Sequence, residues 1–192
     1  MCDTKGIIYK GRTEGMNPIK EQVATLTNSN QLRGSLDDAL VGADVFIGVS
    51  VADILTEAHI KSMAKDSIVF GLANPNPEIT PENAKKWGVR IIGTGRSDHA
   101  NQINNLLAFP GIFRGALDVR ATDINEAMKL AAVEAIASLV TEEELHEDFI
   151  VPSSFDERVA SVVARAVGSA AIESGVSDLF QQVNVVKQTI AI

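Results

Sequence analysis

Three short apolar runs alternate with helix-like segments between residues 44 and 98, and this alternation constrains the fold more than any other feature. Each run is closed by serine, asparagine or glycine, and the three are Asp44–Val49, Ser67–Ala73 and Val89–Ile92. Thr56–Ala64 has a helical pattern between the first two, and Thr80-Pro81 begins another helix after the second. Uninterrupted apolar runs favour strands that are buried on both faces. Strands that alternate with helices predict parallel pairing in a doubly wound α/β sheet.

Capping residues predict where the other helices begin and end. Ser35, with Asp38 three residues later, is typical of a helix start, and Gly88 ends the helix that Thr80 begins. A capping-box-like start over residues 123–126 predicts a helix to about Val140, and another over 154–157 predicts a helix to about Ser174. Gly175 stops the second of these helices. Its apolar residues share one stripe: Val159, Val162, Val163, Ala166 and Ala170.

The two ends of the chain have weaker patterns. Gly6–Lys10 predicts a short strand or hairpin, residues 11–34 are polar and suggest no element, and Gln181–Ile192 is a weakly patterned tail. We therefore expect one domain over residues 1–177, with its C-terminal helices from about residue 123, and a tail over 178–192.

Charge and cysteine content exclude several classes of protein. The 192 residues carry a net charge of −8, which argues against nucleic-acid binding and against a polybasic membrane anchor. No apolar stretch reaches the roughly 18 residues of a membrane span, and the first ten residues lack a signal-peptide pattern. Cys2 is the one cysteine, so an internal disulfide and a cysteine-based zinc site are excluded. We expect a cytoplasmic protein with no nucleic-acid or membrane partner.

The carboxyl ends of the predicted strands are the candidate ligand site, because open α/β sheets bind ligands there. The three ends are Gly48-Val49-Ser50, Ala73-Asn74-Pro75 and Gly93–Asp98. Glycine lets a backbone approach a ligand closely, and a carboxamide such as that of Asn74 can hold a ribose hydroxyl or a hydroxy acid. Each end also has a plainer interpretation, since Ser50 can simply end a strand and Asn74-Pro75 is a strong turn signal.

Other polar residues leave two interpretations open. The adjacent Asn104 and Asn105, in a predicted helix, are either ligand contacts or part of a solvated face. Asp3 is either an ordinary terminal acid or the acid that follows the second strand of a dinucleotide fold and binds the adenosine ribose. His99 beside Asp98 is weak evidence for an acid–base pair, because neighbouring helical residues point apart. The sequence holds no G-x-G-x-x-G turn that begins a strand–helix–strand unit.

Several long motifs are specific enough to indicate a protein family. The most specific run combines Gly93-Thr-Gly-Arg-Ser-Asp98, Asn101–Asn105 and Phe109-Pro-Gly-Ile-Phe-Arg-Gly-Ala-Leu-Asp118. This run resembles the shorter bacterial malic enzymes. Further segments match in family order, and these are Asp3–Gly6, Gly48–Ser50, Ala73–Pro75, Met128–Ala132 and Val151–Asp156. The resemblance extends from residue 3 to about Ser177. It implies a Rossmann-like NAD(P)-binding domain that lacks its first strand and glycine-rich loop and carries C-terminal helices.

The resemblance also implies a reaction and residue roles. Malic enzymes oxidise malate with NAD or NADP and decarboxylate the product to pyruvate, using Mg²⁺ or Mn²⁺. By resemblance, Asp3 binds the adenosine ribose, Gly48, Val49 and Ser50 line the nicotinamide, and Asn74 contacts the nicotinamide ribose and the substrate. Asn105 binds the malate carboxylate, with Asn104 beside it. A carboxylate at Asp3 favours NAD, because it repels the 2′-phosphate of NADP.

The resemblance places other family groups outside this chain. The tyrosine–lysine acid–base pair, the three carboxylate metal ligands and the glycine-rich loop lie upstream of the matched segment in the family. We therefore expect no catalytic residue or metal ligand here, and no malic enzyme activity from this chain alone. Partners would be malate or pyruvate in the complete enzyme and a second copy or an upstream half. A truncated or split fragment that associates with a partner chain remains open, as does another Rossmann dehydrogenase.

Overall fold

The computed structural model describes residues 1–178 and divides the chain into two compact units, Met1–Gly93 and Thr94–Ile192. Each unit is described by itself below. The expected tail over Gln181–Ile192 lies outside the described residues. Assignment of residues 1–177 to one NAD(P)-binding domain stays a prediction.

The first unit begins with a small hairpin. Strands β1 (Cys2–Asp3) and β2 (Gly6–Ile7) pair antiparallel, in agreement with the strand or hairpin expected around Gly6. Helix α1 (Pro18–Leu26) follows in a segment for which the sequence predicted no element. Its start is a standard one, since the Asn17 side chain accepts a hydrogen bond from the Lys20 amide and Pro18 is the first helical residue.

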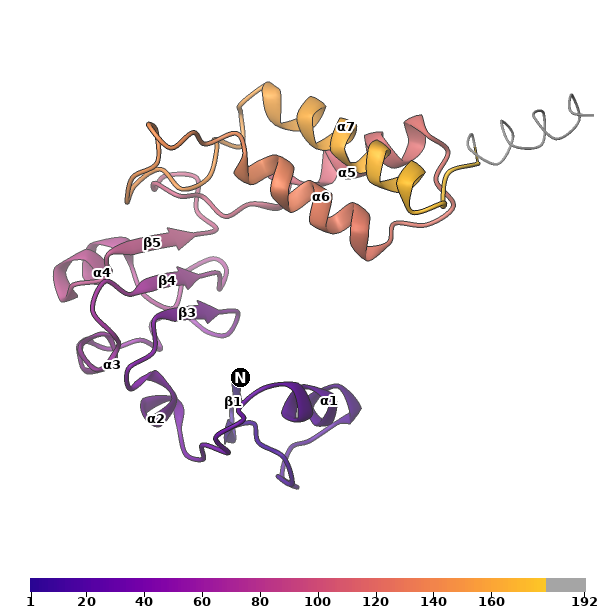
Figure 1. Ribbon diagram of the computed structural model, residues 1–192. Coiled ribbons are helices and arrows are strands. Elements are labelled where there is room, and N and C mark those ends of the chain that lie inside the picture. The colour runs from indigo at the N-terminus through magenta and orange to yellow at the C-terminus, as the bar shows by residue number, and fades with distance from the viewer. Residues whose placement is uncertain (179–192) are drawn as a thin grey trace, which may run out of the picture. The chain divides into compact units, whose positions relative to one another are not determined.

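The rest of the first unit alternates helices with strands, as the sequence predicts (Figure 1). In chain order the elements are α2 (Leu36–Leu40), β3 (Val45–Gly48), α3 (Glu57–Ser62), β4 (Ile68–Gly71), α4 (Pro81–Trp87) and β5 (Ile91–Thr94). The sheet order is β3-β4-β5, and β3 and β4 are parallel with Gly48 opposite Gly71. The predicted α/β class with a parallel sheet is therefore confirmed.

Local capping chemistry sets the helix ends in this unit. Ser35 and Asp38 form a reciprocal capping box at the start of α2, as expected. Thr80 caps α4, and Gly88 ends it in a left-handed conformation at φ +105°, where a residue without a Cβ is favoured. Strand β5 begins at Ile91, two residues later than the predicted start at Val89.

The core of the first unit lies on one side of the sheet. Val69, Ile79 and Ala84 are almost fully buried there, and Trp87 packs against the same cluster. Strand β3 differs from its prediction, since burial on both faces is wrong for this strand in the described chain. Val45 and Ile47 are 47% and 64% exposed, because no residue of the first unit covers the face of the sheet that they occupy.

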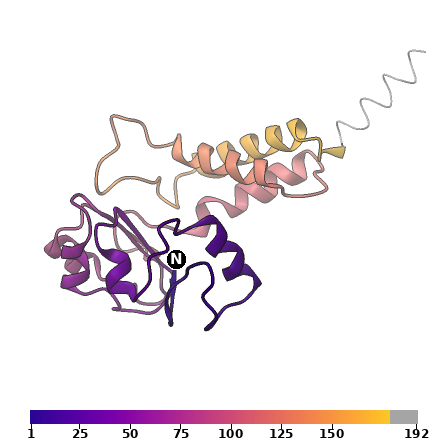
Figure 2. The ribbon, with the colours of Figure 1, turned by 60° about the horizontal axis from the view of Figure 1, so that its bottom comes forward.

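The described part of the second unit, up to residue 178, is built from helices. These are the 3-10 helix η1 (Asn105–Leu107), α5 (Phe109–Asp118), α6 (Glu126–Ala137) and α7 (Arg158–Glu173). Figure 2 shows the three α-helices side by side. The stripe predicted for α7 is confirmed, since Val159 and Val163 are buried in the core and Val162, Ala166 and Ala170 pack against it. Gly175 ends α7 at φ +76°, as predicted.

Two of these helices begin later than their capping patterns predict. Helix α6 is capped by Asn125 rather than by Asp123, and it ends at Ala137 rather than near Val140. Helix α7 begins at Arg158, four residues after the predicted cap Ser154. The physical reason at α6 is that Asn125 accepts a hydrogen bond from the Met128 amide, which ties down the first turn there.

Candidate functional site

The ends of β3 and β4 lie beside each other at one edge of the sheet. Gly48 and Gly71 are the last residues of the two strands and are paired in register. The Leu72 amide continues the ladder by donating to the Gly48 carbonyl at 3.0 Å. The structure therefore places Gly48, Val49 and Ser50 next to the segment that leads into Asn74.

Glu78 joins these two strand ends, and sequence reasoning missed this residue. One carboxylate oxygen, Oε1, accepts hydrogen bonds from the Ser50 amide at 2.7 Å and the Ser50 hydroxyl at 3.1 Å. The other, Oε2, accepts one from the Ala73 amide at 3.0 Å. Glu78 has no exposed surface, so a buried acid fixes both segments. Its partners are mainly backbone amides, and because every residue except proline has one, no residue pattern indicates such contacts.

The groups around this anchor are open to solvent. Val49 is 80% exposed, and Asn74 and Ser50 are exposed as well. The Asn74–Pro75 peptide bond is cis. The two strand ends therefore present peptide groups, an aliphatic side chain and a carboxamide, all uncharged, above a buried carboxylate.

Asp3 belongs to a different cluster of the first unit. Its two oxygens accept from Arg12 Nη2 at 2.7 Å each, and Oδ2 also accepts from Lys20 Nζ at 2.6 Å. The side chain of Arg12 is 5% exposed and donates further to the carbonyls of Gly6 and Ile7. The carboxylate of Asp3 therefore holds the N-terminal hairpin to the segment that leads into α1.

The charges of this cluster set the titration of Asp3. Burial opposes its ionisation, but the hydrogen bonds from Lys20 and Arg12 outweigh burial and hold the pKa of Asp3 far below its usual value. Asp3 also lines a cavity of about 820 Å³, together with Tyr9, Arg33 and Ser35. The cation of Arg33 lies 4.5 Å from the centre of the Tyr9 ring in this region.

Asn104 and Asn105 lie in the second unit, at the start of a short helix rather than inside one. Asn104 is the N-cap of η1, and its Oδ1 accepts from the Leu106 amide at 3.0 Å. Asn105 is the first residue of η1 and is exposed. The expected position within a helix is wrong for Asn104, because asparagine prefers a cap, where its side chain replaces a missing backbone partner.

Asn101 is a polar residue of the same loop that sequence reasoning missed. It is 6% exposed, its Nδ2 donates to the Glu147 carbonyl at 2.8 Å, and its Oδ1 accepts from the Ile150 amide at 2.9 Å. The carboxamide thus joins the loop before η1 to the loop before α7. Its neighbour Gln102 forms a bridge with Thr94.

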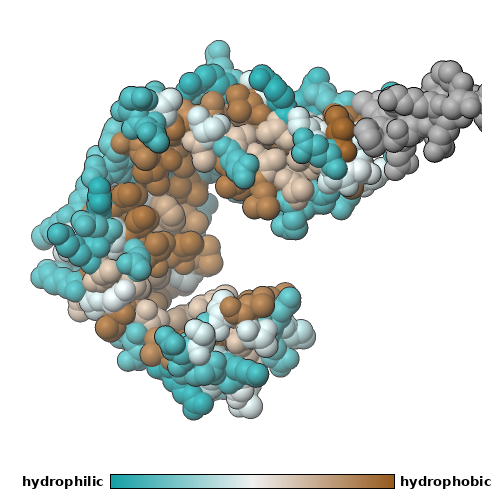
Figure 3. Space-filling view, in the orientation of Figure 1, coloured by the Kyte–Doolittle hydropathy of each residue, from teal (hydrophilic) through white to brown (hydrophobic). Residues whose placement is uncertain are grey.

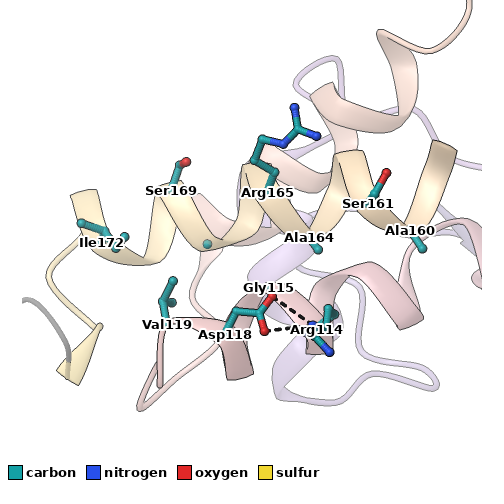
Figure 4. A pocket seen from close by; sticks show the side chains of 11 residues that line it. Arg114, Gly115, Asp118, Val119, Ala160, Ser161, Ala164, Arg165, Ser169 and Ile172 are labelled. Atoms are coloured by element: carbon teal, nitrogen blue, oxygen red, sulfur yellow. Dashed lines mark hydrogen bonds and ion pairs between the residues drawn. The ribbon is translucent and has the colours of Figure 1, made fainter.

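A second cavity, of about 630 Å³, lies between α5 and α7 and contains none of the expected site residues (Figure 4). Small residues such as Gly115 and Ala164 let the two helices approach closely there. At its rim Arg114 Nε donates to Asp118 Oδ2 at 3.0 Å. This cavity is a product of helix packing, and nothing in it marks a reaction site.

Neither a metal-binding cluster nor a membrane-spanning helix occurs in residues 1–178. Within this range no three histidine, cysteine, aspartate or glutamate side chains converge as metal ligands. The described helices are too short or too polar to cross a bilayer. His59, a residue of α3, pairs with Asp37 at 3.0 Å, and His99 lies 3.9 Å from Asp98.

Comparison with known proteins identifies the family. The model of the family described as malic enzyme, NAD binding domain, matches residues 1–172. The chain belongs to this family. The match covers the strand ends, Glu78 and both asparagines of η1. A bifunctional malic/malolactic enzyme from Bacillus subtilis is 63% identical over 92% of this chain, and an NAD-dependent malic enzyme from Geobacillus stearothermophilus is 55% identical over 91%.

The relatives are much longer than this chain. The matched region is 43% of the Bacillus protein and 36% of the Geobacillus protein, so the chain spans less than half of each. Further similar relatives are named as NADP-dependent enzymes. Among solved structures, a malic enzyme from Pyrococcus horikoshii has a TM-score of 0.79 and 48% identity, with 84% of this chain and 37% of that one covered. These likenesses support a malic-enzyme NAD-binding fold for the chain.

Proposed function

We propose that this chain supplies the nicotinamide-side contacts of a malic enzyme, which converts malate to pyruvate and CO₂ with reduction of NAD(P). The observation that carries the proposal is the edge formed by Gly48–Ser50 and Asn74, in a chain of the malic enzyme family. Its exposed uncharged groups suit a nicotinamide and its ribose, because a carboxamide can donate and accept without adding charge. When bound, NAD(P) accepts the hydride that malate loses.

The residues of the two units have distinct proposed roles. The Asn74 carboxamide hydrogen-bonds the nicotinamide ribose and the substrate, while Gly48, Val49 and Ser50 line the nicotinamide. Asn104 and Asn105 donate amide N–H groups to the malate carboxylate. The cap geometry supports this role for Asn104, since its oxygen is engaged by the Leu106 amide and its nitrogen is left to donate.

Asp3 is proposed to contact the adenosine ribose and to favour NAD over NADP. Its carboxylate is already bonded to Arg12 and Lys20, so a ribose hydroxyl would have to share it with these two cations. The cations also weaken the repulsion that Asp3 exerts on a 2′-phosphate. We therefore expect a preference for NAD that is modest in size.

The metal and the acid–base groups are proposed to come from outside this chain. The residues described here offer no ligand set that suits Mg²⁺ or Mn²⁺, and no step of the reaction is assigned to such an ion in this chain. We expect the isolated chain to form no pyruvate from malate, NAD and Mn²⁺. Metal-dependent pyruvate formation by the pure chain would overturn this part of the proposal.

A second candidate is a non-catalytic, truncated or split fragment that works with a partner chain. Exposed apolar residues in β3 and directly after it favour this candidate. Their side chains are 47–80% exposed, and the residues are Val45, Ile47, Val49 and Val51. Figure 3 shows apolar side chains gathered over this sheet. A partner carrying the rest of the domain, or a second copy in a homo-oligomer, would bury them. Sedimentation of the chain with and without the unmatched part of the Bacillus relative separates these outcomes.

Calorimetric titration of the chain with NAD and with NADP tests the main proposal. We expect binding in the micromolar to millimolar range, weakened about tenfold by Asn74→Ala, because one ribose hydrogen bond is worth about 1 kcal/mol or more. Asn76→Ala is the matched control, since Asn76 is exposed in the same turn and has no proposed contact. Equal affinity in both variants would contradict the assignment of Asn74.

A further inference from the structure

We propose that Glu78 is a positioning residue of the cofactor edge, one that holds the backbone of Ser50 and Ala73 in place for the nicotinamide half of the dinucleotide. The inference rests on the proposed function and adds a residue to it. Three donors from two strand ends converge on one buried carboxylate, at 2.7, 3.1 and 3.0 Å. No other carboxylate described in this chain joins two strands of the sheet in this way.

The two strands leave a slot for this carboxylate. A Cβ at Gly48 would lie 2.5 Å from Glu78 Cδ, so any side chain there would displace the acid. A Cβ at Gly71, the register partner of Gly48, would lie 3.4 Å from Oε2. Gly48 therefore makes room for the acid and is needed as glycine although its backbone is not left-handed, whereas a Cβ at Gly71 would only be in ordinary contact with Oε2.

The backbone of Glu78 is held as firmly as its side chain. The Leu55 amide donates to the Glu78 carbonyl at 3.0 Å, and the Asp53 amide donates to the Pro77 carbonyl at 3.1 Å. Ile79, the next residue, is 2% exposed. Because the backbone of Glu78 is fixed, its side chain can hold Ser50 and Ala73 in fixed positions.

The chemistry of the slot requires an acceptor with two oxygens. A carboxylate accepts at both atoms, whereas a carboxamide of the same shape presents one oxygen and one NH₂ group. In Glu78→Gln either the Ser50 or the Ala73 amide would face another donor and lose its partner. The segment that carries that amide would then be released, while the packing volume of the side chain stays the same.

Hydrogen exchange of the two amides, followed by NMR, tests the anchor without any cofactor. In the unmodified chain both amides should exchange at least about tenfold slower than in an unstructured peptide, and Glu78→Gln should abolish this protection for at least one of them. Glu82→Gln is the matched control, because Glu82 is exposed on α4. Peptide-like exchange of either amide in the unmodified chain would overturn the proposal even if the variant does not fold.

Binding measurements separate positioning from general stability. We expect Glu78→Gln to weaken NAD binding about tenfold and to leave the affinity for AMP, the adenosine half, within about twofold. Equal losses for NAD and AMP would show a general structural role and overturn the proposal. If the unmodified chain binds neither ligand, the proposed function fails, and the positioning role for the cofactor fails with it. Slow hydrogen exchange of the Ser50 and Ala73 amides would in that case show only that Glu78 anchors the two strand ends.

Discussion

Two carboxylates of the first unit are used inside the protein in opposite ways. Glu78 accepts from two backbone amides and a hydroxyl and joins the ends of two strands. Asp3 accepts from Arg12 and Lys20 and joins the N-terminal hairpin to α1. Glu78, the first anchor, orders the backbone by accepting from neutral donors, whereas Asp3, the second anchor, balances the charges of Arg12 and Lys20. An acid near a proposed cofactor site can therefore act on the ligand through the backbone it fixes.

The largest expected effect comes from filling the slot of the first anchor. Gly48→Ala places a methyl group 2.5 Å from Glu78 Cδ, so the carboxylate must move and two amides lose their acceptor. We expect a loss of about 3 kcal/mol in the free energy of unfolding, measured with urea. Gly95→Ala is the control, since its Cβ would be 4.0 Å from the nearest atom. Equal stability of the two variants would contradict the slot.

Removal of Arg12 tests the second anchor. Arg12→Met keeps the aliphatic volume but deprives Asp3 of its bidentate partner and leaves the Gly6 and Ile7 carbonyls without that donor. We expect a loss of about 2 kcal/mol in the free energy of unfolding, because Lys20 still pairs with Asp3. Arg33→Met, which removes an exposed cation over Tyr9, should cost less than about 1 kcal/mol.

Low pH should weaken the Asp3 anchor, because the pKa of Asp3 is lowered in the folded chain. The unfolded chain has an ordinary aspartate pKa near 3.9 and the folded chain a lower one, so protons bind the unfolded state first. The stabilisation from Asp3 is therefore complete above about pH 4 and is lost as the pH falls towards the folded pKa. Urea unfolding from pH 5 to about pH 2 should show a shallower decline for Asp3→Asn than for the unmodified chain. An identical decline in the free energy of unfolding for both chains would show that the Asp3 carboxylate does not stabilise the fold.

The smallest effect should come from the Ser50 hydroxyl. Ser50→Ala removes one of the three donors to Glu78 and keeps both backbone amides. We expect a loss of about 0.5 kcal/mol in the free energy of unfolding and unchanged protection of the Ala73 amide. A loss as large as that of Gly48→Ala would mean that the hydroxyl, and not the backbone, carries the anchor.

Much of the fold could be predicted because the signals are local. The capping box of Ser35, the proline after Thr80 and the glycine at 88 act within one helical turn, and the structure contains each of them. Helix α1 had the same kind of signal at Asn17-Pro18, which lay in a segment judged only by its polarity. The exposed β3 face could not be foreseen, because an apolar run does not say which residues cover it.

The candidate site was predictable only in part. Parallel strands end at one edge, so the pattern alone placed Gly48–Ser50 beside the segment of Asn74. Glu78 was missed because its partners at positions 50 and 73 are backbone amides far apart in sequence. The roles of Asp3, Asn104 and Asn105 came from family resemblance and remain predictions.

The most direct test of the central claim is to map NAD on the chain by NMR. We expect added NAD to shift the amide signals of Val49, Ser50 and Asn74 most strongly, with smaller shifts around Asp3. The helices α5 and α7, which line the other cavity, should show no change. Shifts confined to those helices, or no shifts from a folded chain, would contradict the claim that the ends of β3 and β4 form the nicotinamide side of the site.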